Sequence, residues 1–397
     1  MSIILPFNFA SFPNIIFGAG KLKELYNIIP NFGKNVLFVI GGNSLKKSGK
    51  WDEISSVLVS KSVNFFYIAI AGEPSPSIVD ETSAKFRDKN INIVIGIGGG
   101  SVIDAGKAIS AMLPQKDSIR NYLEGVGNKA HDGRKVPYIA VPTTSGTGSE
   151  ATKNAVISEI GPNGFKKSLR HDNLVPNMAI IDPELVISCP PSISAACGLD
   201  AFTQLLEAYV SSKANPISDA LAFSGMKYIK DNVIQACTTG ASDINVRAAM
   251  AYGSLMSGIT LANAGLGIVH GLASPIGSGF NIPHGVVCGT LLSEATKMNI
   301  KNLQKLGPAG KGGLKKHAEI GALLVGKEIV SEKKVQEYCS VLIDTLERWT
   351  EKLSIDRLSK YGIKSEDIDK IVKNAELKNN PVKLSNEDIK IILRNRL

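Results

Sequence analysis

Residues 91–107, with the sequence INIVIGIGGGSVIDAGK, decide the fold. The run Ile91–Ile97 is almost continuously apolar, which predicts a strand buried on both faces of a sheet. Three glycines follow it, and from Val102 onward the apolar residues recur at helical spacing. A strand, a glycine turn and a helix in this order are typical of a nucleotide-binding α/β domain.

The glycine turn is a candidate phosphate site. Gly98, Gly99 and Gly100 have no side chains, so backbone N–H groups can approach a phosphate closely. The helix that begins near Ser101 and carries Asp104 adds the positive end of its dipole. We predict that this turn holds the pyrophosphate of a dinucleotide. The alternative is a glycine-rich turn that binds nothing, because such triplets also occur without a ligand.

Strands and helices alternate on both sides of this stretch. Strands are expected up to Phe17 and at residues 36–40, 63–70, 91–97 and 136–141, and helices at residues 21–29, 51–61 and 78–89. Apolar strands alternating with amphipathic helices predict a parallel sheet covered on both faces, a Rossmann-like α/β fold. The last strand leads into residues 142–150, where hydroxyl side chains and glycines gather at the same sheet edge. We expect them to line the nucleotide site, although a capped turn is the simpler alternative.

From Pro183 onward the pattern becomes helical. Helical spacing recurs at residues 217–237, 245–264, 318–325 and 333–353. The sequence therefore predicts two domains, an α/β domain over residues 1–182 and an all-helical domain over residues 183–397. The basic, glycine-rich segment at residues 311–316 is expected to be a surface loop.

The helical half contains a candidate metal site. His270 and His284 flank a segment rich in glycine, serine and proline, which we expect to be a loop between two helices. Asp200 and Gln204 are four residues apart, so they share one face of a helix. One carboxylate, one amide and two imidazoles form a suitable ligand set for a divalent metal. The alternatives are that the histidines are core residues and that Asp200 is an N-terminal polar residue of its helix.

The composition excludes several classes of protein. The net charge of +9 raises the question of a polyanion, but the basic residues are dispersed and the densest group lacks aromatic residues, so we expect no nucleic-acid partner. The 5 cysteines form no C-x-x-C pair, which argues against disulfides and against a thiolate zinc site and favours a reducing compartment. No apolar run reaches the roughly 18 residues of a membrane span. We expect a cytoplasmic protein.

These motifs together resemble the iron-containing (group III) alcohol dehydrogenase family, which is more distantly related to dehydroquinate synthase. The likeness extends over almost the whole chain. It is carried by the motifs at residues 98–107, 142–152, 181–185, 197–201 and 263–285. The resemblance implies a dinucleotide-binding domain, an all-helical metal-binding domain with the active site between them, and a homo-oligomer, a dimer or larger.

The resemblance also implies roles for particular residues. The expected cofactor contacts are Gly41, Gly98, Gly99, Gly100, Ser101, Asp104, Thr143, Thr144, Thr147, Ser149, Asn154 and Lys166. Asp200, His270 and His284 match family metal ligands, and Gln204 stands where the family has a third histidine. Ser274 stands where the family has a histidine beside the nicotinamide and substrate.

The two exchanges have chemical consequences. An amide oxygen is a poorer donor than imidazole and suits harder cations, so Gln204 either binds the metal, iron or zinc, more weakly or only forms a hydrogen bond while the metal is lost. The hydroxyl of Ser274 does not titrate near neutral pH, so as a catalytic residue it is a poorer proton relay than imidazole. In relatives that prefer NAD, an acidic residue follows the strand that here ends in Gly41-Gly42-Asn43. Without that acid, with Lys46 or Lys47 nearby, the balance favours NADP slightly over NAD.

The leading hypothesis is a metal-dependent, NAD(P)-linked alcohol dehydrogenase or aldehyde reductase that transfers a hydride between nicotinamide C4 and a small alcohol and carbonyl pair. One alternative is a lyase or cyclase of the dehydroquinate synthase type. Another is a nucleotide-binding homologue with impaired catalysis, suggested by Gln204 and Ser274 together.

Overall fold

The computed structural model describes residues 4, 6–161, 164–327 and 330–397. Contacts within the chain divide it into two compact units. One unit comprises residues 10–144 and 148–189, and the other comprises residues 1–9, 145–147 and 190–397. Residues 145–147 group with the second unit. The hydroxyl-rich stretch at residues 142–150 is therefore divided between the two units.

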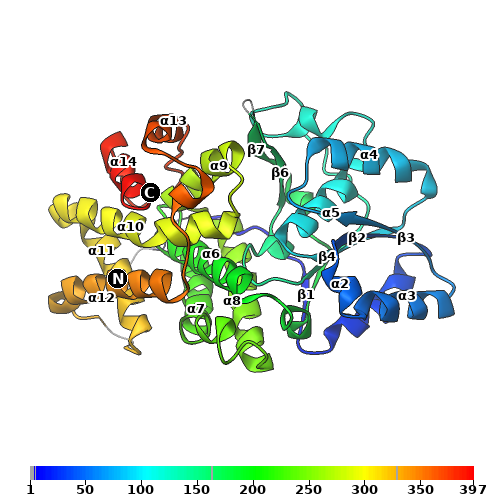
Figure 1. The fold of residues 1–397 in the computed structure, drawn as a ribbon, viewed down its shortest axis with the longest axis horizontal. Coiled ribbons are helices and arrows are strands. Elements are labelled where there is room, and N and C mark those ends of the chain that lie inside the picture. Colours follow the sequence, from blue (N-terminus) through cyan, green and yellow to red (C-terminus); the bar gives the residue numbers. More distant parts are fainter. Residues whose placement is uncertain (1–3, 5, 162–163, 328–329) are drawn as a thin grey trace. The chain divides into compact units, whose positions relative to one another are not determined.

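The first unit is built on a six-stranded sheet in which all pairings are parallel. The strand order is β1-β8-β5-β4-β2-β3 (Figure 1). The strands are β1 (Asn14–Phe17), β2 (Asn35–Gly41), β3 (Asn64–Ile70), β4 (Ile93–Gly98), β5 (Tyr138–Pro142) and β8 (Met178–Ile181). This arrangement confirms the predicted parallel sheet. The continuous apolar runs form its central strands, because only a strand buried on both faces has no need of alternating polar residues.

Helices cover both faces of this sheet. One face packs against α4 and α5, which share a buried cluster with Leu37, Val39 and Val94. The other face packs against α1 and α3. Their buried cluster includes Phe38 and the other strand residues whose side chains point away from α4 and α5. The helices of this unit are α1 (Leu25–Ile28), α2 (Ser44–Lys47), α3 (Lys50–Ser60), α4 (Pro76–Phe86) and α5 (Gly100–Met112).

Two glycines make room for a tyrosine beneath helix α5. The hydroxyl of Tyr138 on β5 donates a hydrogen bond of 2.8 Å to the carbonyl of Ile103. A Cβ atom on Gly96 would lie 2.2 Å from that hydroxyl oxygen, and a Cβ atom on Gly106 would lie 2.8 Å from the tyrosine ring. These glycines therefore set how closely α5 packs on the sheet, and so where its N-terminus lies.

The sequence pattern did not predict one pair of strands. β6 (Asn154–Glu159) and β7 (Phe165–Arg170) pair with each other in antiparallel register, apart from the main sheet. β7 reads FKKSLR, and most of its residues are only half-buried. A strand with so few apolar residues lacks the signal by which the others were predicted.

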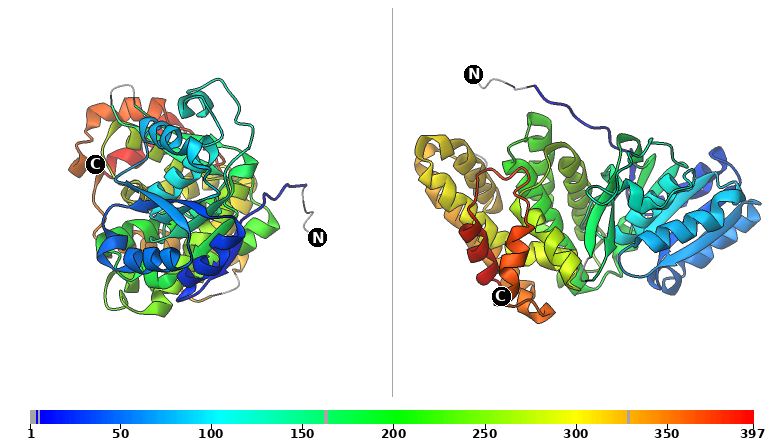
Figure 2. Two further views of the ribbon diagram at one scale, coloured as in Figure 1. Left: turned by 90° about the vertical axis from the view of Figure 1, so that its right-hand side faces the viewer. Right: turned by 90° about the horizontal axis from the view of Figure 1, so that it is seen from above.

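The second unit is helical in its described parts, which confirms the predicted all-helical C-terminal half (Figure 2). Its α-helices are α6 (Pro191–Val210), α7 (Pro216–Asn232), α8 (Ile244–Ala264), α9 (Ile268–Gly279), α10 (His284–Lys305), α11 (Lys311–Leu324), α12 (Val335–Lys352), α13 (Ile368–Lys373) and α14 (Asn386–Arg394). α6 packs against α7, α8 and α10 and is buried on nearly all sides from Ser194 onward. It is the central helix of the unit.

The structure overturns the expected surface loop in this half and excludes one alternative for Asp200. Residues 311–316 are not a loop but the first turns of α11. Gly313 packs on Leu303, and Lys316 bonds to the carbonyl of Tyr209 at 2.7 Å, so tertiary contacts stabilise a helix that glycine disfavours. Asp200 is also not an N-terminal residue, because α6 begins at Pro191 and Asp200 lies in its middle.

Within the described ranges, no single helix is long and apolar enough to cross a membrane. α8 and α9 are long and apolar enough only when taken together, and the chain bends by 100° between them.

Candidate metal centre and nucleotide-binding turn

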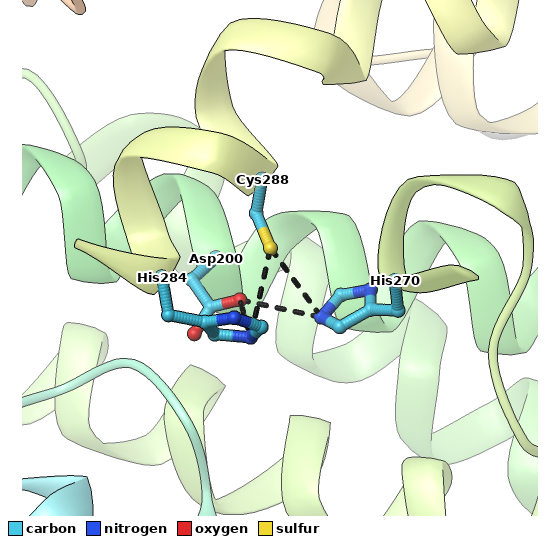
Figure 3. Close-up of side chains that lie close together, drawn as sticks. All are labelled: Asp200, His270, His284 and Cys288. Atoms are coloured by element: carbon cyan, nitrogen blue, oxygen red, sulfur yellow. Dashed lines mark hydrogen bonds and ion pairs between the residues drawn. The ribbon is translucent and has the colours of Figure 1, made fainter. Parts of the chain in front are cut away.

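Four side chains from three helices meet in the helical unit. Asp200 comes from α6, His270 from α9, and His284 and Cys288 from α10 (Figure 3). Their potential ligand atoms all lie within 4.8 Å of one another. The Oδ1 atom of Asp200 is 3.4 Å from Nε2 of His270 and 3.7 Å from Nε2 of His284. This convergence brings together three of the four predicted metal residues.

The segment between the two histidines is helical up to Gly279, so the expected loop between two helices is limited to residues 280–283. α9 includes Pro275, which has no N–H to donate to the carbonyl of Gly271 four residues earlier. That carbonyl instead accepts a bond from the backbone N–H of Glu376, at 3.5 Å. A Cβ atom on Gly271 would lie 1.7 Å from the carbonyl oxygen of Glu376, so only glycine permits this approach. A neighbouring segment thus replaces the hydrogen bond that proline removes.

Glu207 holds His270 in place. Its Oε1 atom accepts a hydrogen bond of 2.7 Å from the backbone N–H of Val269, in the first turn of α9. Its Oε2 atom lies 2.7 Å from Nδ1 of His270. A carboxylate only accepts, so Nδ1 carries the hydrogen and Nε2 faces Asp200 and Cys288. Glu207 therefore caps the helix and orients the imidazole at once.

Asp200 is ionised in this setting. Only 2% of its side chain is exposed. Its Oδ1 atom is buried and has no hydrogen-bond partner among the described residues. Burial by itself raises the pKa of this carboxyl, but His284 and His270 outweigh that effect and bring the pKa down to about 2. A buried carboxylate oxygen without a donor suits a cation.

The proton-binding groups beside Asp200 are also perturbed. Burial lowers the pKa of His270, but Cys288, Asp200 and Glu207 together raise it well above its usual value. Burial raises the pKa of the Cys288 thiol to about 12. Binding a divalent ion therefore means displacing protons from the imidazole and the thiol, as it does at zinc sites generally.

These residues fit the divalent metal that the sequence predicts. The donors are a carboxylate, two imidazoles and a thiol, which are the groups that bind zinc and other divalent transition metals. Among the described residues the buried Oδ1 atom of Asp200 accepts no hydrogen bond, and Glu207 directs the ring nitrogen of His270 toward it. A bound ion would satisfy both groups.

Gln204 and Ser274 each follow a residue of this cluster by four positions in the sequence. Gln204 is buried one turn after Asp200 on α6, and its Oε1 atom lies 3.1 Å from the hydroxyl of Ser257 on α8, which is closer to the carbonyl of Ser254, at 2.8 Å. Ser274 is half-buried on α9, one turn after His270. The predicted metal and catalytic roles of these two residues remain proposals.

The glycine turn has the predicted geometry. β4 ends at Gly98, and α5 begins at Gly100, with Gly99 in an extended conformation before it. The backbone N–H groups of Gly100 and Ser101 fall in the first helical turn, where no intrahelical acceptor exists. The turn is half-buried from Gly99 to Ser101. It therefore offers donors and a helix dipole to an anion.

Two threonines that follow strand β5 lie beside this turn. The backbone N–H of Thr143 donates 2.9 Å to the carbonyl of Gly98. A Cβ atom on Gly99 would contact the side chain of Thr144 at 3.4 Å. Thr147 groups with the helical unit, together with Gly146, whose carbonyl oxygen lies 3.4 Å from the Ser257 hydroxyl.

The other predicted cofactor residues surround α5 and β6. Ser149 bonds to the carboxylate of Asp104, which also accepts from the backbone N–H of Val156 at 3.0 Å. Asn154 begins β6, and its Oδ1 atom is buried without a hydrogen-bond partner in the described structure. Lys166 on β7 forms an ion pair with Glu73. Asp104 thus has a clear structural role whatever its contact with a cofactor.

Gly41 ends strand β2, at the edge of the sheet where the carboxyl ends lie. Gly42 and Asn43 are exposed after it. The Lys46 ammonium bonds to the Tyr67 hydroxyl at 3.3 Å and lies 4.6 Å from the centre of that ring.

Sequence reasoning missed two residues of the metal centre, Cys288 and Glu207. Both had a usable signal. Cys288 follows His284 by four residues and Glu207 follows Asp200 by seven, and these spacings place each pair on one helix face. A pattern of paired cysteines does not identify Cys288, because its neighbours are a histidine of the same helix and residues of two other helices.

With this geometry in place, comparison with known proteins decides the family. The model of iron-containing alcohol dehydrogenases matches residues 13–183, and the C-terminal model of the same family matches residues 194–397. The chain belongs to the iron-containing alcohol dehydrogenase family. This confirms the resemblance, and membership implies a divalent metal and a nicotinamide cofactor.

Relatives and solved structures agree with the family across the whole chain. Long-chain-alcohol dehydrogenase 1 of Geobacillus thermodenitrificans is 33% identical over 383 residues, covering 94% of this chain and 93% of the relative. The NAD-dependent methanol dehydrogenase of Bacillus methanolicus is 30% identical and covers 98% of this chain and 100% of the relative. An archaeal alcohol dehydrogenase from a Red Sea brine pool superposes with a TM-score of 0.88 at 26% identity, with 100% of both chains covered. The family assignment identifies the chain as an oxidoreductase.

Proposed function

We propose that this chain is a metal-dependent alcohol dehydrogenase that transfers a hydride between C4 of a nicotinamide cofactor and a small alcohol and carbonyl pair. The convergence of Asp200, His270 and His284 on one buried point carries the proposal. Relatives named for methanol, long-chain alcohols and sulfoacetaldehyde support an alcohol and aldehyde pair as the substrate class. The metal is iron or zinc.

When bound, the divalent ion would act as a Lewis acid that stabilises the alkoxide form of the substrate in oxidation and polarises the carbonyl in reduction. Asp200 supplies a full negative charge to hold it, and Glu207 presents the lone pair of His270. The backbone N–H groups of Gly100 and Ser101 bind the pyrophosphate and so fix the position of the cofactor. The Ser274 hydroxyl relays a proton along a hydrogen-bond chain, because it both donates and accepts hydrogen bonds but does not ionise near neutral pH.

NADP is the proposed cofactor, with NAD second. The exposed Gly42 and Asn43 place no carboxylate after β2, so nothing there repels a 2′-phosphate. Relatives named for NAD and for NADPH both occur in the family, which leaves the choice to residues of this chain. The cytoplasmic location and the homo-oligomer also remain predictions.

A direct test purifies the protein without chelator, measures its metal content, and follows nicotinamide absorbance with a panel of primary alcohols and aldehydes. We expect turnover with at least one substrate. The variant Asp200→Asn keeps the shape but removes the charge, so kcat/KM should fall by about 100-fold or more. The control Asp243→Asn changes a carboxylate that caps α8 and should leave kcat/KM within about threefold of the natural protein. No turnover with either cofactor and with iron, zinc or manganese supplied would contradict the proposal.

The two alternatives give different results. An impaired homologue would bind the cofactor tightly without metal or turnover, and the double variant Gln204→His with Ser274→His would then gain activity that the natural chain lacks. The cyclase alternative has no support from the family models, relatives and structures named above.

A further inference from the structure

We propose that Cys288 is a ligand of the metal and that its thiolate takes the place of the imidazole missing at Gln204. The site would then consist of Asp200, His270, His284 and Cys288, and it would select zinc over iron. The inference rests on the proposed function, because it names the metal class of the same site.

The spacing of the four side chains supports this ligand set. Zinc binds nitrogen and oxygen at about 2.0–2.1 Å and sulfur at about 2.3 Å, so tetrahedral neighbours lie about 3.4 Å apart for nitrogen and oxygen and about 3.6 Å apart for nitrogen and sulfur. The Sγ atom of Cys288 is 3.6 Å from Nε2 of His270 and 3.7 Å from Nε2 of His284. The corresponding distances from Oδ1 of Asp200 are 3.4 and 3.7 Å. These four of the six separations match the edges of a zinc tetrahedron, and the other two are no longer than 4.8 Å.

A hydrogen-bonded core cysteine explains these contacts less well. One S–H group has one hydrogen, so it can donate to only one of the two imidazoles that Sγ approaches. The buried Oδ1 atom of Asp200 would then depend on the two imidazoles, whose Nε2 atoms lie 3.4 and 3.7 Å away, outside good hydrogen-bond geometry. A shared cation accounts for all four groups at once (Figure 3).

Gln204 is the competing fourth ligand. Its Oε1 atom lies 3.1 Å from the Ser257 hydroxyl, and its side chain forms no hydrogen bond with His270 or His284 within the described part of the chain. Cys288 is buried and approaches both histidines directly. The thiol is therefore better placed than the amide.

A thiolate ligand changes the chemistry of the site. On binding, the Cys288 proton leaves to solvent and the sulfur carries a negative charge, so Asp200 and Cys288 together neutralise a divalent ion. Soft thiolate favours zinc, while carboxylate and amide oxygens favour harder ions. The site thus compensates for the lost imidazole with a different donor.

Cobalt spectroscopy tests the inference without reference to activity. The full-length protein is stripped of metal with a chelator, dialysed and titrated with Co²⁺, and the near-ultraviolet charge-transfer band of a cobalt–thiolate bond is recorded. Competition with a chromogenic chelator gives the dissociation constants of Zn²⁺ and Fe²⁺. We expect one Co²⁺ per chain, the thiolate band, and zinc bound at least about tenfold more tightly than iron.

Three variants separate the possible ligands. Cys288→Ala should lose the band and weaken zinc binding by about 100-fold or more. Cys339→Ala is the matched control, because Cys339 is an equally buried thiol whose Sγ faces the carbonyl of Leu314 at 3.5 Å, and it should change neither quantity. Gln204→Ala should keep the band and change zinc binding by less than about tenfold. Thermal unfolding in chelator checks that the variants fold alike.

The outcomes are decisive in both directions. Absence of the band in the natural protein overturns the inference without any variant, even if Cys288→Ala fails to fold. A band that survives in Cys288→Ala, or a 100-fold loss in Gln204→Ala alone, also overturns it. Turnover of alcohol without the band means that the inference fails and the proposed function stands. The band without turnover means that Cys288 is a metal ligand and the proposed function fails.

Discussion

Glu207 and His270 are joined by a hydrogen bond of 2.7 Å between Oε2 and Nδ1, and both side chains are buried. The second oxygen of Glu207 accepts from the backbone of the helix that carries His270. One carboxylate thus fixes both the start of α9 and the orientation of the imidazole in its first turn. The direction of the ring nitrogen is set before any metal arrives, which lowers the cost of forming the site.

Glu207→Gln tests this positioning role. An amide has one acceptor and one donor end, so one of the two N–H groups that Glu207 serves would face another donor. We expect zinc affinity to fall by about 10- to 100-fold, the range for loss of a carboxylate behind a histidine ligand. Glu319→Gln is the control, since Glu319 accepts a hydrogen bond of 2.7 Å from the Tyr209 hydroxyl rather than from a histidine. Zinc affinity within threefold of the natural protein in Glu207→Gln would show that the bond does not position the ring.

The fold was predictable where local patterns and burial agree. The strands β2 and β4 are continuous apolar runs between turn residues, and such runs are stable only in the interior of a parallel sheet. β7 was not predictable by that pattern, because it contains few apolar residues. It is half-buried and pairs only with β6, so it does not need a continuous apolar run.

The metal centre was predictable in part for the same kind of reason. His270 and His284 were found because the chain has only 5 histidines, and Asp200 because Gln204 follows it by four residues on one helix face. The helix around Pro275 was missed because its hydrogen bonds depend on Glu376, about a hundred residues later in the chain, at 3.5 Å from Gly271. Such a contact leaves no trace in local sequence.

Gly42→Asp tests the choice of cofactor. Gly42 does not have a positive φ, and apart from its two chain neighbours no atom of the described residues lies within 4 Å of the position that a Cβ would take, so an aspartate fits without strain. Its carboxylate would repel a 2′-phosphate and accept a bond from a 2′-hydroxyl. We expect kcat/KM for NADPH to fall by about tenfold or more while that for NADH rises. The isosteric control Gly42→Asn lacks the charge. Equal effects of the two variants on both cofactors would contradict the electrostatic account.

Lys107→Met tests the support of the nucleotide-binding helix. The buried ammonium of Lys107 donates to the carbonyls of Ser149 and Asn154 at 2.8 and 2.7 Å and to the Thr152 hydroxyl at 3.0 Å. Burial lowers its pKa to about 8, so it is still charged at pH 7. Removing it leaves these buried acceptors unpaired, which should cost about 3–5 kcal/mol of stability.

Differential scanning calorimetry measures that loss as a lower unfolding temperature of the α/β unit. The exposed Lys116 provides the control, because Lys116→Met should stay within about 0.5 kcal/mol of the natural protein. An unfolding temperature equal to that of the control would mean that water replaces the ammonium at no cost.

His317→Leu tests the acid sensitivity of the helical unit. His317 is fully buried in α11, with Nδ1 2.8 Å from the carbonyl of Gly313 and Nε2 without a hydrogen-bond partner in the described structure. Burial lowers its pKa from 6.5 to about 4. Between those two pH values the unfolded chain binds a proton that the folded chain refuses, so stability is complete above pH 6.5 and falls as the pH drops toward 4. The loss at pH 4 is about 3 kcal/mol.

Leucine has no proton to bind, so His317→Leu should lose that much less stability between pH 7 and pH 4 than the natural protein does. The measurement is the unfolding temperature of both proteins across this range, with chelator present so that metal release does not contribute. His171→Asn changes a half-exposed histidine of the other unit and should follow the natural curve. Parallel curves for the natural protein and His317→Leu would mean that the buried imidazole is protonated in the folded state at little cost, and that acid unfolding begins elsewhere.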